Sequence, residues 1–417
     1  MMIEAALAAV ALAAEPVFTF EGSTRVRYET LSAPFRAGRQ GSDQQLSWRT
    51  RILGEYDAGA VTFGIEGFDS RAYLTDDGSF LSSTAINTLD VLQAYVRLDH
   101  EKGALQAGRF VMNVGSRRLA GENSFRNWPS AFEGVRGEYA LSDDLTFEAF
   151  YTAPVERRPG DRAALLDNDQ EFDEADWDTR FWAAHLTHGN LFSGVDGEVY
   201  LFGLNEDGGD DLYTLGGRLE RGAEAGAFDF DLELMWQTGE TGAGLDVSAA
   251  NLHAEAGYSF AGAWSPRLSA QLIYATGDEN PADAEFNRFD RLYGLRRGQL
   301  GQTGIMGPLD IENIVALGGR LEVARGPVTA HVLLQTVSLA SDTDRWRRAG
   351  LRDVTGGSGD HVGEVIDTRL RWWIAPDRLR LEAGAAVLFK GEFAKTAPGA
   401  PDDDTPVYSY LMLTKYF

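Results

Sequence analysis

The sequence contains no cysteine, only four lysines and no long apolar segment. The absence of cysteine excludes disulfides, thiolate metal sites and cysteine nucleophiles. The longest apolar run, residues 5–14, is well short of the ~20 residues that a membrane-spanning helix needs. A net charge of −25 argues against a nucleic-acid partner, because such proteins need a basic face to replace phosphate counterions. If the chain crosses a membrane, it therefore does so with strands.

Residues 1–14 have the pattern of a secretory signal peptide, with an apolar stretch and a small-residue site for cleavage near Ala14 or Glu15. The segment departs from that pattern because it carries Glu4 and no basic residue. A start site assigned too late would explain this departure, and a short amino-terminal helix is the alternative interpretation. The expected organisation is therefore a signal peptide at residues 1–14 and a single domain at residues 15–417.

The rest of the chain alternates polar and apolar residues over stretches that are bounded by Gly, Asp, Asn or Pro, which is typical of half-buried strands. Eighteen such stretches are predicted: 17–30, 43–57, 59–73, 87–100, 103–114, 131–141, 144–155, 177–188, 195–206, 211–222, 227–239, 246–260, 265–278, 311–325, 327–340, 361–374, 377–391 and 407–417.

The connections between these stretches alternate in length. Short turns such as residues 57–59 follow the even-numbered strands, whereas most odd-numbered strands are followed by long connections such as 115–130 and 279–310. Short periplasmic turns and long extracellular loops are typical of bacterial barrels, and a soluble β-sandwich has no reason to keep that order. The sequence therefore predicts an all-β, antiparallel up-and-down transmembrane barrel of about 18 strands in the bacterial outer membrane, with both termini on the periplasmic side.

The two faces of the predicted strands differ in kind. In the first strand Phe18 and Phe20 share one parity, while Arg25 and Arg27 share the other. We expect the apolar parity to face lipid and the polar parity to face a water-filled lumen. Aromatic residues near strand ends suit the membrane interfaces, as for Trp48, Trp236, Trp264 and Tyr416.

The carboxy-terminal stretch VYSYLMLTKYF should pair with the first strand and remove the edges of the sheet. We place Leu411, Leu413 and Phe417 toward lipid, with Lys415 reaching the periplasmic rim. An edge strand of a soluble sandwich is the alternative interpretation of this stretch alone.

Arginine accounts for 34 of the 38 basic residues, since only four are lysine. Arginine keeps its charge and binds carboxylates with a planar fork, so a ring of inward arginines favours anions. The predicted pore-lining residues are Arg25, Arg27, Arg49, Arg51, Arg97, Arg109, Arg136, Arg180, Arg218, Arg320, Arg369, Arg371 and Arg380. The alternative is pairing with inward Glu and Asp, which we expect for about half of them because buried charges need partners.

The acidic excess lies largely in loops, above all at 167–178 and 402–404, so the pore and the whole chain can have opposite charge. The first run could hold divalent cations, but a solvated loop is the favoured interpretation.

Two stretches are more specific than strand alternation. Residues 103–141 and 274–319 contain a Gly-Arg strand, downstream arginines, an Asn-Trp pair, a Phe-x-Gly-x-Arg strand and a Phe-Asp-x-Leu-Tyr-Gly element. Here the chain resembles the alginate export family of outer-membrane channels. The matching residues are Gly108, Arg109, Arg118, Asn127, Trp128, Phe132, Gly134, Arg136, Phe289, Asp290 and Gly294. Phe110 and Glu133 depart from the family, which favours Gln and Asp at these positions.

The resemblance implies an eighteen-stranded channel with a positively charged constriction that passes an anionic uronate polymer. We therefore expect an anion-selective channel that exports acidic polysaccharide such as alginate. The expected partners are an anionic polysaccharide or oligosaccharide, outer-membrane lipid and lipopolysaccharide, the barrel-assembly machinery and periplasmic export proteins. We expect no cofactor, no metal and no nucleic acid.

Two other functions stay open at this point. The first is a less specific porin for the uptake of oligosaccharides or small solutes. The second is a barrel enzyme such as a lipase, which the sequence does not favour. The six histidines are scattered, none sits in a nucleophile turn, and no His-Glu-x-x-His spacing occurs.

Overall fold

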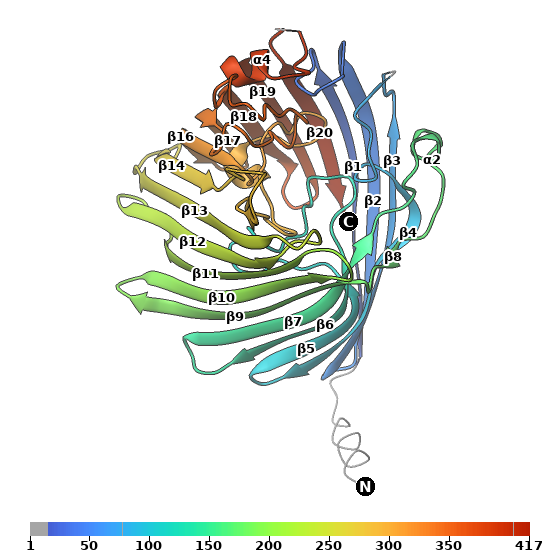
Figure 1. Cartoon of the computed structure of the whole chain (residues 1–417). Helices are drawn as coiled ribbons and strands as arrows, with labels where there is room; N and C mark the ends of the chain where they lie inside the picture. The colour runs from blue at the N-terminus through green and yellow to red at the C-terminus, as the bar shows by residue number, and fades with distance from the viewer. Residues whose placement is uncertain (1–15, 77, 403) are drawn as a thin grey trace.

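The computed structural model describes residues 16–76, 78–402 and 404–417, so the predicted signal peptide lies outside the described residues. The described part of the chain forms a closed antiparallel barrel of eighteen long strands (Figure 1). The strands are β1 (Val17–Leu31), β2 (Asp43–Asp57), β3 (Val61–Tyr73), β4 (Asn87–His100), β5 (Gly103–Phe110), β6 (Phe132–Ala140), β7 (Leu145–Glu156), β9 (Thr179–Phe192), β10 (Val195–Glu206), β11 (Asp211–Arg221), β12 (Phe228–Glu240), β13 (Asp246–Ser259), β14 (Arg267–Ala275), β16 (Ile314–Arg325), β17 (Val328–Ser338), β18 (His361–Ala375), β19 (Leu379–Lys390) and β20 (Val407–Tyr416).

Short elements lie in the connections on the extracellular side. Two two-residue strands, β8 (Glu174–Ala175) and β15 (Glu285–Phe286), pair with the ends of β7 and β13. The helices are α2 (Arg162–Asp167), α3 (Arg297–Leu300) and α4 (Glu392–Thr396). No helix among the described residues has the length and apolar character needed to cross a bilayer.

Each of the eighteen predicted strands is present. The largest boundary errors are four residues, at the end of β9, which runs to Phe192 and not 188, and at the end of β5. The prediction extended β5 to residue 114, but it ends at Phe110. Residues 111–114 leave the wall and turn into the barrel, where Val114 N donates to the Ala120 carbonyl at 3.2 Å. The apolar character of this segment therefore reflects packing inside the barrel and not contact with lipid.

Strand β20 closes the barrel by pairing with β1, as predicted. Nine residue pairs run from Ser23 with Tyr416 to Leu31 with Tyr408. The backbone of Phe417 extends the pairing, because its N–H donates to Gly22 O at 3.0 Å and its carbonyl accepts from Gly22 N at 2.9 Å. Both ends of the barrel domain therefore lie at the rim with the short turns.

The predicted faces of the strands are confirmed by exposure. Phe20 is 67% exposed on the outer surface, whereas Arg25 on the opposite parity is 3% exposed. Leu411 and Phe417 are likewise exposed and face outward. One assignment is wrong: Tyr416 faces a cavity inside the barrel and not the membrane interface.

Two long connections fold into the barrel and fill part of it. They are residues 111–131 between β5 and β6, and residues 276–313 between β14 and β16. The two connections pair with each other, since Tyr293 N donates to Leu119 O at 3.0 Å and Leu295 N donates to Arg117 O at 2.8 Å.

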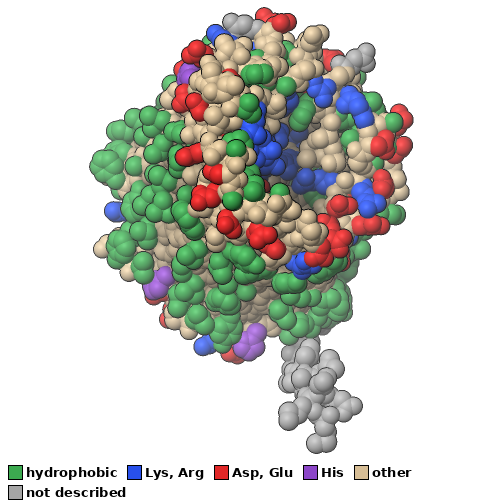
Figure 2. Space-filling view, viewed as in Figure 1, with side chains coloured by type: hydrophobic (Ala, Val, Ile, Leu, Met, Phe, Trp, Pro, Cys, Tyr) green, Lys and Arg blue, Asp and Glu red, His purple; other side chains and the backbone are tan. Residues whose placement is uncertain are grey.

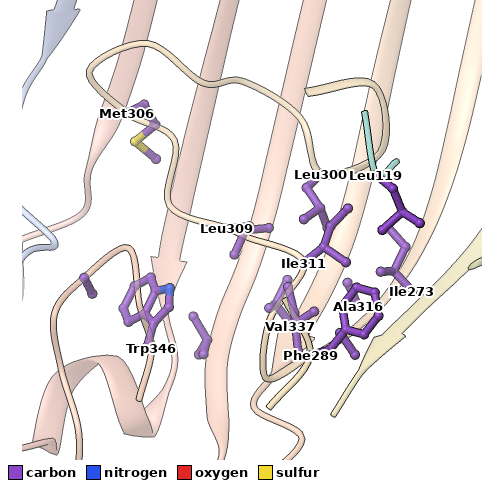
Figure 3. Packing of buried hydrophobic residues seen from close by; sticks show 14 of the residues in the cluster. Leu119, Ile273, Phe289, Leu300, Met306, Leu309, Ile311, Ala316, Val337 and Trp346 are labelled. Atoms are coloured by element: carbon purple, nitrogen blue, oxygen red, sulfur yellow. The ribbon is translucent and has the colours of Figure 1, made fainter. Parts of the chain in front are cut away.

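The inward connections have an apolar core of their own (Figure 3). Leu300, Leu309 and Ile311 pack toward the inner face of the wall, where they meet Ala316 and Val337. All five residues are buried. Burial of this kind stabilises the inward connections by roughly 1.5–3 kcal/mol for each large side chain. The barrel interior is therefore a packed partition with cavities and not an open tube.

Candidate functional site

The inward segment 122–127 is held to the wall by arginines of β1 and β2. Arg25 donates to Ser124 O and Arg126 O at 2.9 Å each, and to Asn127 Oδ1 at 3.1 Å. Arg49 donates to the same two carbonyls at 2.9 and 3.2 Å. Carbonyl groups satisfy the donors of a guanidinium without cancelling its charge. The hydrogen bonds of Arg25 and Arg49 therefore fix the segment and leave two positive charges in the interior.

The next arginines along these strands do have carboxylate partners. Arg27 donates to Glu29 at 2.8 Å and also to the carbonyl of Phe125. Arg51 bridges Glu66 on β3 at 2.6 Å and Glu122 on the segment at 2.5 Å. Arg25, Arg27, Arg49 and Arg51 are among the arginines predicted to line the pore, and all four also hold the segment that divides the interior.

The Asn-Trp pair of the family motif anchors the base of the segment. Asn127 Nδ2 donates to backbone carbonyls of β2, of β3 and of the loop before β4, the shortest bond being 2.8 Å to Ala85 O. Trp128 Nε1 donates to Asp173 Oδ2 at 2.6 Å. Both side chains are buried, so these motif residues have a structural role in this chain.

The other motif residues also have structural roles. Gly108 and Gly134 lie opposite each other on β5 and β6. A Cβ at Gly294 would lie 1.7 Å from Arg118 O, so only glycine allows the two inward connections to approach so closely. Phe132 and Phe289 are fully buried. The side-chain amide of Gln237 on β12 donates to the carbonyl of Asp290 and accepts from its backbone N–H.

An inner cavity lies on the periplasmic side of the segment and has a volume of about 420 Å³. Ser124 and Phe125 of the segment line it. Its charged lining residues are Arg25, Arg49, Arg51, Arg297, Arg371, Arg380, Glu21, Glu66, Glu122 and Glu382.

A smaller outer cavity of about 200 Å³ lies on the extracellular side of the same segment. Arg126 and Asn127 of the segment line it, together with Arg27, Arg296 and Arg348. In Figure 2 basic side chains lie deep in a hollow of the surface, and acidic side chains gather around its rim. The sign of the charge therefore changes from the mouth to the interior.

The thirteen predicted pore arginines fall into two classes. Among the described residues, eight have a carboxylate within 4.0 Å: Arg27, Arg51, Arg97, Arg109, Arg136, Arg180, Arg218 and Arg371. The five without an ion pair to a described carboxylate are Arg25, Arg49, Arg320, Arg369 and Arg380. This agrees with the expectation that about half would be paired.

The structure does not gather all thirteen arginines into one ring. Arg97 is at the periplasmic end of β4, where it pairs with Asp99 at 2.8 Å. Arg136 and Arg218 pair with wall carboxylates at 2.6 and 2.7 Å and line neither cavity. Six of the predicted arginines contribute to the cavities. All six come from the strands on either side of β20, namely β1 and β2 on one side and β18 and β19 on the other: Arg25, Arg27, Arg49, Arg51, Arg371 and Arg380.

Sequence reasoning missed the arginines that the loops bring into the interior. Arg297 of α3 donates to Glu382 at 2.9 Å and to the hydroxyl of Tyr410 at 2.8 Å. Its guanidinium lies 3.6 Å from the centre of the Phe125 ring. Arg126, Arg296 and Arg348 also come from connections. In the sequence, only the high density of arginine at residues 286–297 and 345–352 indicated that these loops carry a basic site.

No metal site is apparent in the part of the chain that the structure describes. No group of three or more His, Asp or Glu side chains there is arranged to hold a metal ion. The acidic residues of the 167–178 run instead bond to neighbouring protein groups, as Asp173 does to Trp128 and Asn87.

Solved structures of outer-membrane channels share this fold. The Pseudomonas aeruginosa channels OccK5 (OpdH) and OpdL match with TM-scores of 0.64 and 0.63 at 12% and 13% identity. Each comparison covers 96% of this chain and 98% of the other. P. aeruginosa OpdK, solved with vanillate, matches with a TM-score of 0.64 at 12% identity and the same coverage. The comparison with curated proteins found no match.

These likenesses establish the fold of an outer-membrane channel. The alginate export family matches residues 17–407, which is nearly the whole barrel. The two motif stretches recognised in the sequence lie within that match. The chain is an outer-membrane β-barrel channel and belongs to the alginate export family.

Proposed function

We propose that this channel is anion-selective and passes acidic polysaccharide or its oligomers, in the export direction that the family implies. One observation carries the proposal: guanidinium groups that have no ion pair to a carboxylate of the described residues lie on both sides of the segment 122–127. Arg25, Arg49 and Arg380 line the inner cavity, and Arg126, Arg296 and Arg348 line the outer one.

The low-dielectric wall of the barrel focuses the electric field of these arginines into the interior. Focused positive potential raises the local concentration of anions, even though the chain as a whole carries a charge of −25. Conduction also requires release, so several weak sites serve better than one tight site. Arginines already held by carbonyls suit this role, because they keep their charge but offer few free donors to a passing carboxylate.

Passage of a polymer requires the segment to move. Phe125 and Ser124 bound the inner cavity, while Arg126 bounds the outer one, so the segment lies between the two spaces. In the proposed mechanism the polyuronate carboxylates compete with the backbone carbonyls for Arg25 and Arg49, and the segment swings aside. The proposal includes no chemical step.

The proposal is tested by measuring flux into liposomes that contain the whole chain. Oligouronates should enter faster than neutral oligosaccharides of equal length. Replacing two of the five wall arginines that have no ion pair to a described carboxylate, as R369Q with R380Q, should reduce that preference. R97Q at the rim is the matched control and should have little effect, since Arg97 is already paired and 41% exposed. Equal flux of charged and neutral sugars would contradict the proposal.

Uptake of small carboxylates is the second candidate function. Cavities of about 420 and 200 Å³ suit small molecules, and one channel of the same fold was solved with vanillate, an aromatic carboxylate. The same liposomes distinguish the two functions. Rapid entry of vanillate without entry of a uronate trimer would favour the second.

A further inference from the structure

The outer cavity gathers positive charge from three separate loops. Arg126 comes from the connection before β6, Arg296 from the connection before β16 and Arg348 from the connection before β18. None of these three has a carboxylate within ion-pair distance among the described residues. Glu29 also lines the cavity, but it is occupied by Arg27 at 2.8 Å and by Tyr408 at 2.7 Å.

Two of these guanidiniums are fixed in position by the backbone of one turn. Arg296 donates to Gly307 O at 3.2 Å, and Arg348 donates to the same carbonyl at 3.1 Å. A Cβ at Gly307 would lie 2.8 Å from Arg296 Nη2, so glycine permits this approach. The side chain of Arg126 donates no hydrogen bond to any described residue, so its donors remain free for a ligand.

Arg36 and Phe80 lie beside the cluster formed by Arg126, Arg296 and Arg348. Arg36 donates to Ile305 O at 2.9 Å and stacks on Phe80, with 3.8 Å from its guanidinium carbon to the ring centre. Arg348 lies 5.8 Å from the centre of the same ring. Phe80 itself lines the cavity. An aromatic face shared by two cations holds them near each other before any ligand arrives.

Like charges held together at this depth are unfavourable without a counter-charge. Burial, together with the charge of Arg348, lowers the pKa of Arg36 to about 9. Burial and the neighbouring Arg348 also lower the pKa of Arg296. The charge of Asp310 raises this pKa but does not offset the other two effects. An anion with several charges would relieve this repulsion more than a single carboxylate could.

We propose that the outer cavity is a binding site for a compact polyanion, meaning a small molecule with two or more negative charges on neighbouring acidic groups. The inference rests on the proposed anion selectivity but goes beyond it, because a channel that only passes anions needs no such site. The volume of about 200 Å³ excludes a long chain segment. Di- and tricarboxylates and inorganic phosphate share the required chemistry.

The test is calorimetric titration of the whole chain in detergent at fixed ionic strength. Citrate, succinate and inorganic phosphate are compared with glucuronate, which carries one charge. Citrate or phosphate should bind at least about tenfold more tightly than glucuronate, since each further charge pairs with a fixed guanidinium. Whichever of citrate and inorganic phosphate binds more tightly shows whether the site prefers carboxylate or phosphate groups.

The variant R126Q with R348Q should abolish that preference. Because removing arginines from the cluster could also disturb folding, Thr303→Asp is the second variant. Thr303 lines the cavity, and the new carboxylate would neutralise the cluster with every arginine retained. R97Q serves as the control. Equal affinity for mono- and polyanions, or an unchanged preference in both variants, would overturn the proposal.

Failure of this site can be told apart from failure of the proposed function. The reversal potential of the wild-type channel measures its selectivity, and calorimetry of the same protein measures binding in the outer cavity, so the two results are independent. A wild-type channel without anion selectivity that still binds citrate would refute the proposed function and retain the site. The reverse result would refute the site alone.

Discussion

At the scale of single residues, the acceptor that each arginine finds decides what its charge can do. Arg51 lies between Glu66 and Glu122, so its charge is cancelled locally. Arg25 and Arg49 find carbonyl oxygens, so their charges persist. Strand alternation in the sequence predicts that all three face inward. It cannot predict their partners on the inward segment, because these lie about 70–100 positions away in a loop without periodicity.

Asp173 provides a pH-dependent contact at the base of the inward segment. It is 6% exposed and accepts hydrogen bonds from Trp128 and Asn87 at 2.6 Å each. Burial is the main cause that raises its pKa from 3.8 to about 7, and Asp90 adds to the effect. The native state therefore binds more protons than the unfolded state between these two values, so the stabilising contribution falls as pH rises through that window.

We expect hydrogen exchange at residues 157–178 to become faster between pH 5 and pH 8, after correction for the intrinsic pH dependence of exchange. D173N should remove most of the corrected change, because the amide does not titrate. D178N is the matched control on the same loop, where Asp178 is exposed. A corrected pH dependence that is the same in wild type and D173N would contradict the assignment.

At the scale of elements, the segment 122–127 is the part that sequence patterns could not place. The strands were predictable because period-two alternation and turn residues are local properties. The inward path of residues 111–131 depends on contacts with the far wall and with residues 276–313. Only the motif residues indicated that this connection is special, and they did so through family resemblance.

Loosening this segment should open the channel. In R25Q with R49Q the segment loses its charge-assisted hydrogen bonds, each worth about 1.5–3 kcal/mol. We expect a higher single-channel conductance with weaker anion selectivity. R25K with R49K keeps the charges but lacks the planar fork, so conductance should rise while selectivity is retained. Unchanged conductance in both variants would show that the segment does not limit flow.

The closing strand is a second element with a testable role. Phe417 makes two backbone hydrogen bonds to Gly22. A Cβ on Gly22 would lie only 2.4 Å from the ring of Phe417, so the ring packs directly over this glycine. Deleting Phe417 should reduce the yield of folded barrel, measured by heat-dependent migration in gel electrophoresis. The folded fraction should keep wild-type selectivity, because Phe417 lines neither cavity. Normal assembly of the deletion variant would contradict this role.

At the scale of the whole molecule, charge is separated by location. The chain carries −25 overall, and acidic side chains gather around the mouth of the hollow in Figure 2, while arginines without an ion pair to a described carboxylate line the cavities inside. Strand parity in the sequence places arginine on the inner face, and the structure adds the loop arginines that parity could not reveal.

The sign of the selectivity is the central claim, and the reversal potential of a single channel in a salt gradient measures it directly. With potassium chloride at unequal concentrations across the bilayer, we predict a potential of the sign set by chloride. Polyuronate added to one side should then reduce the current. A potential set by potassium, with no effect of polyuronate, would contradict the account.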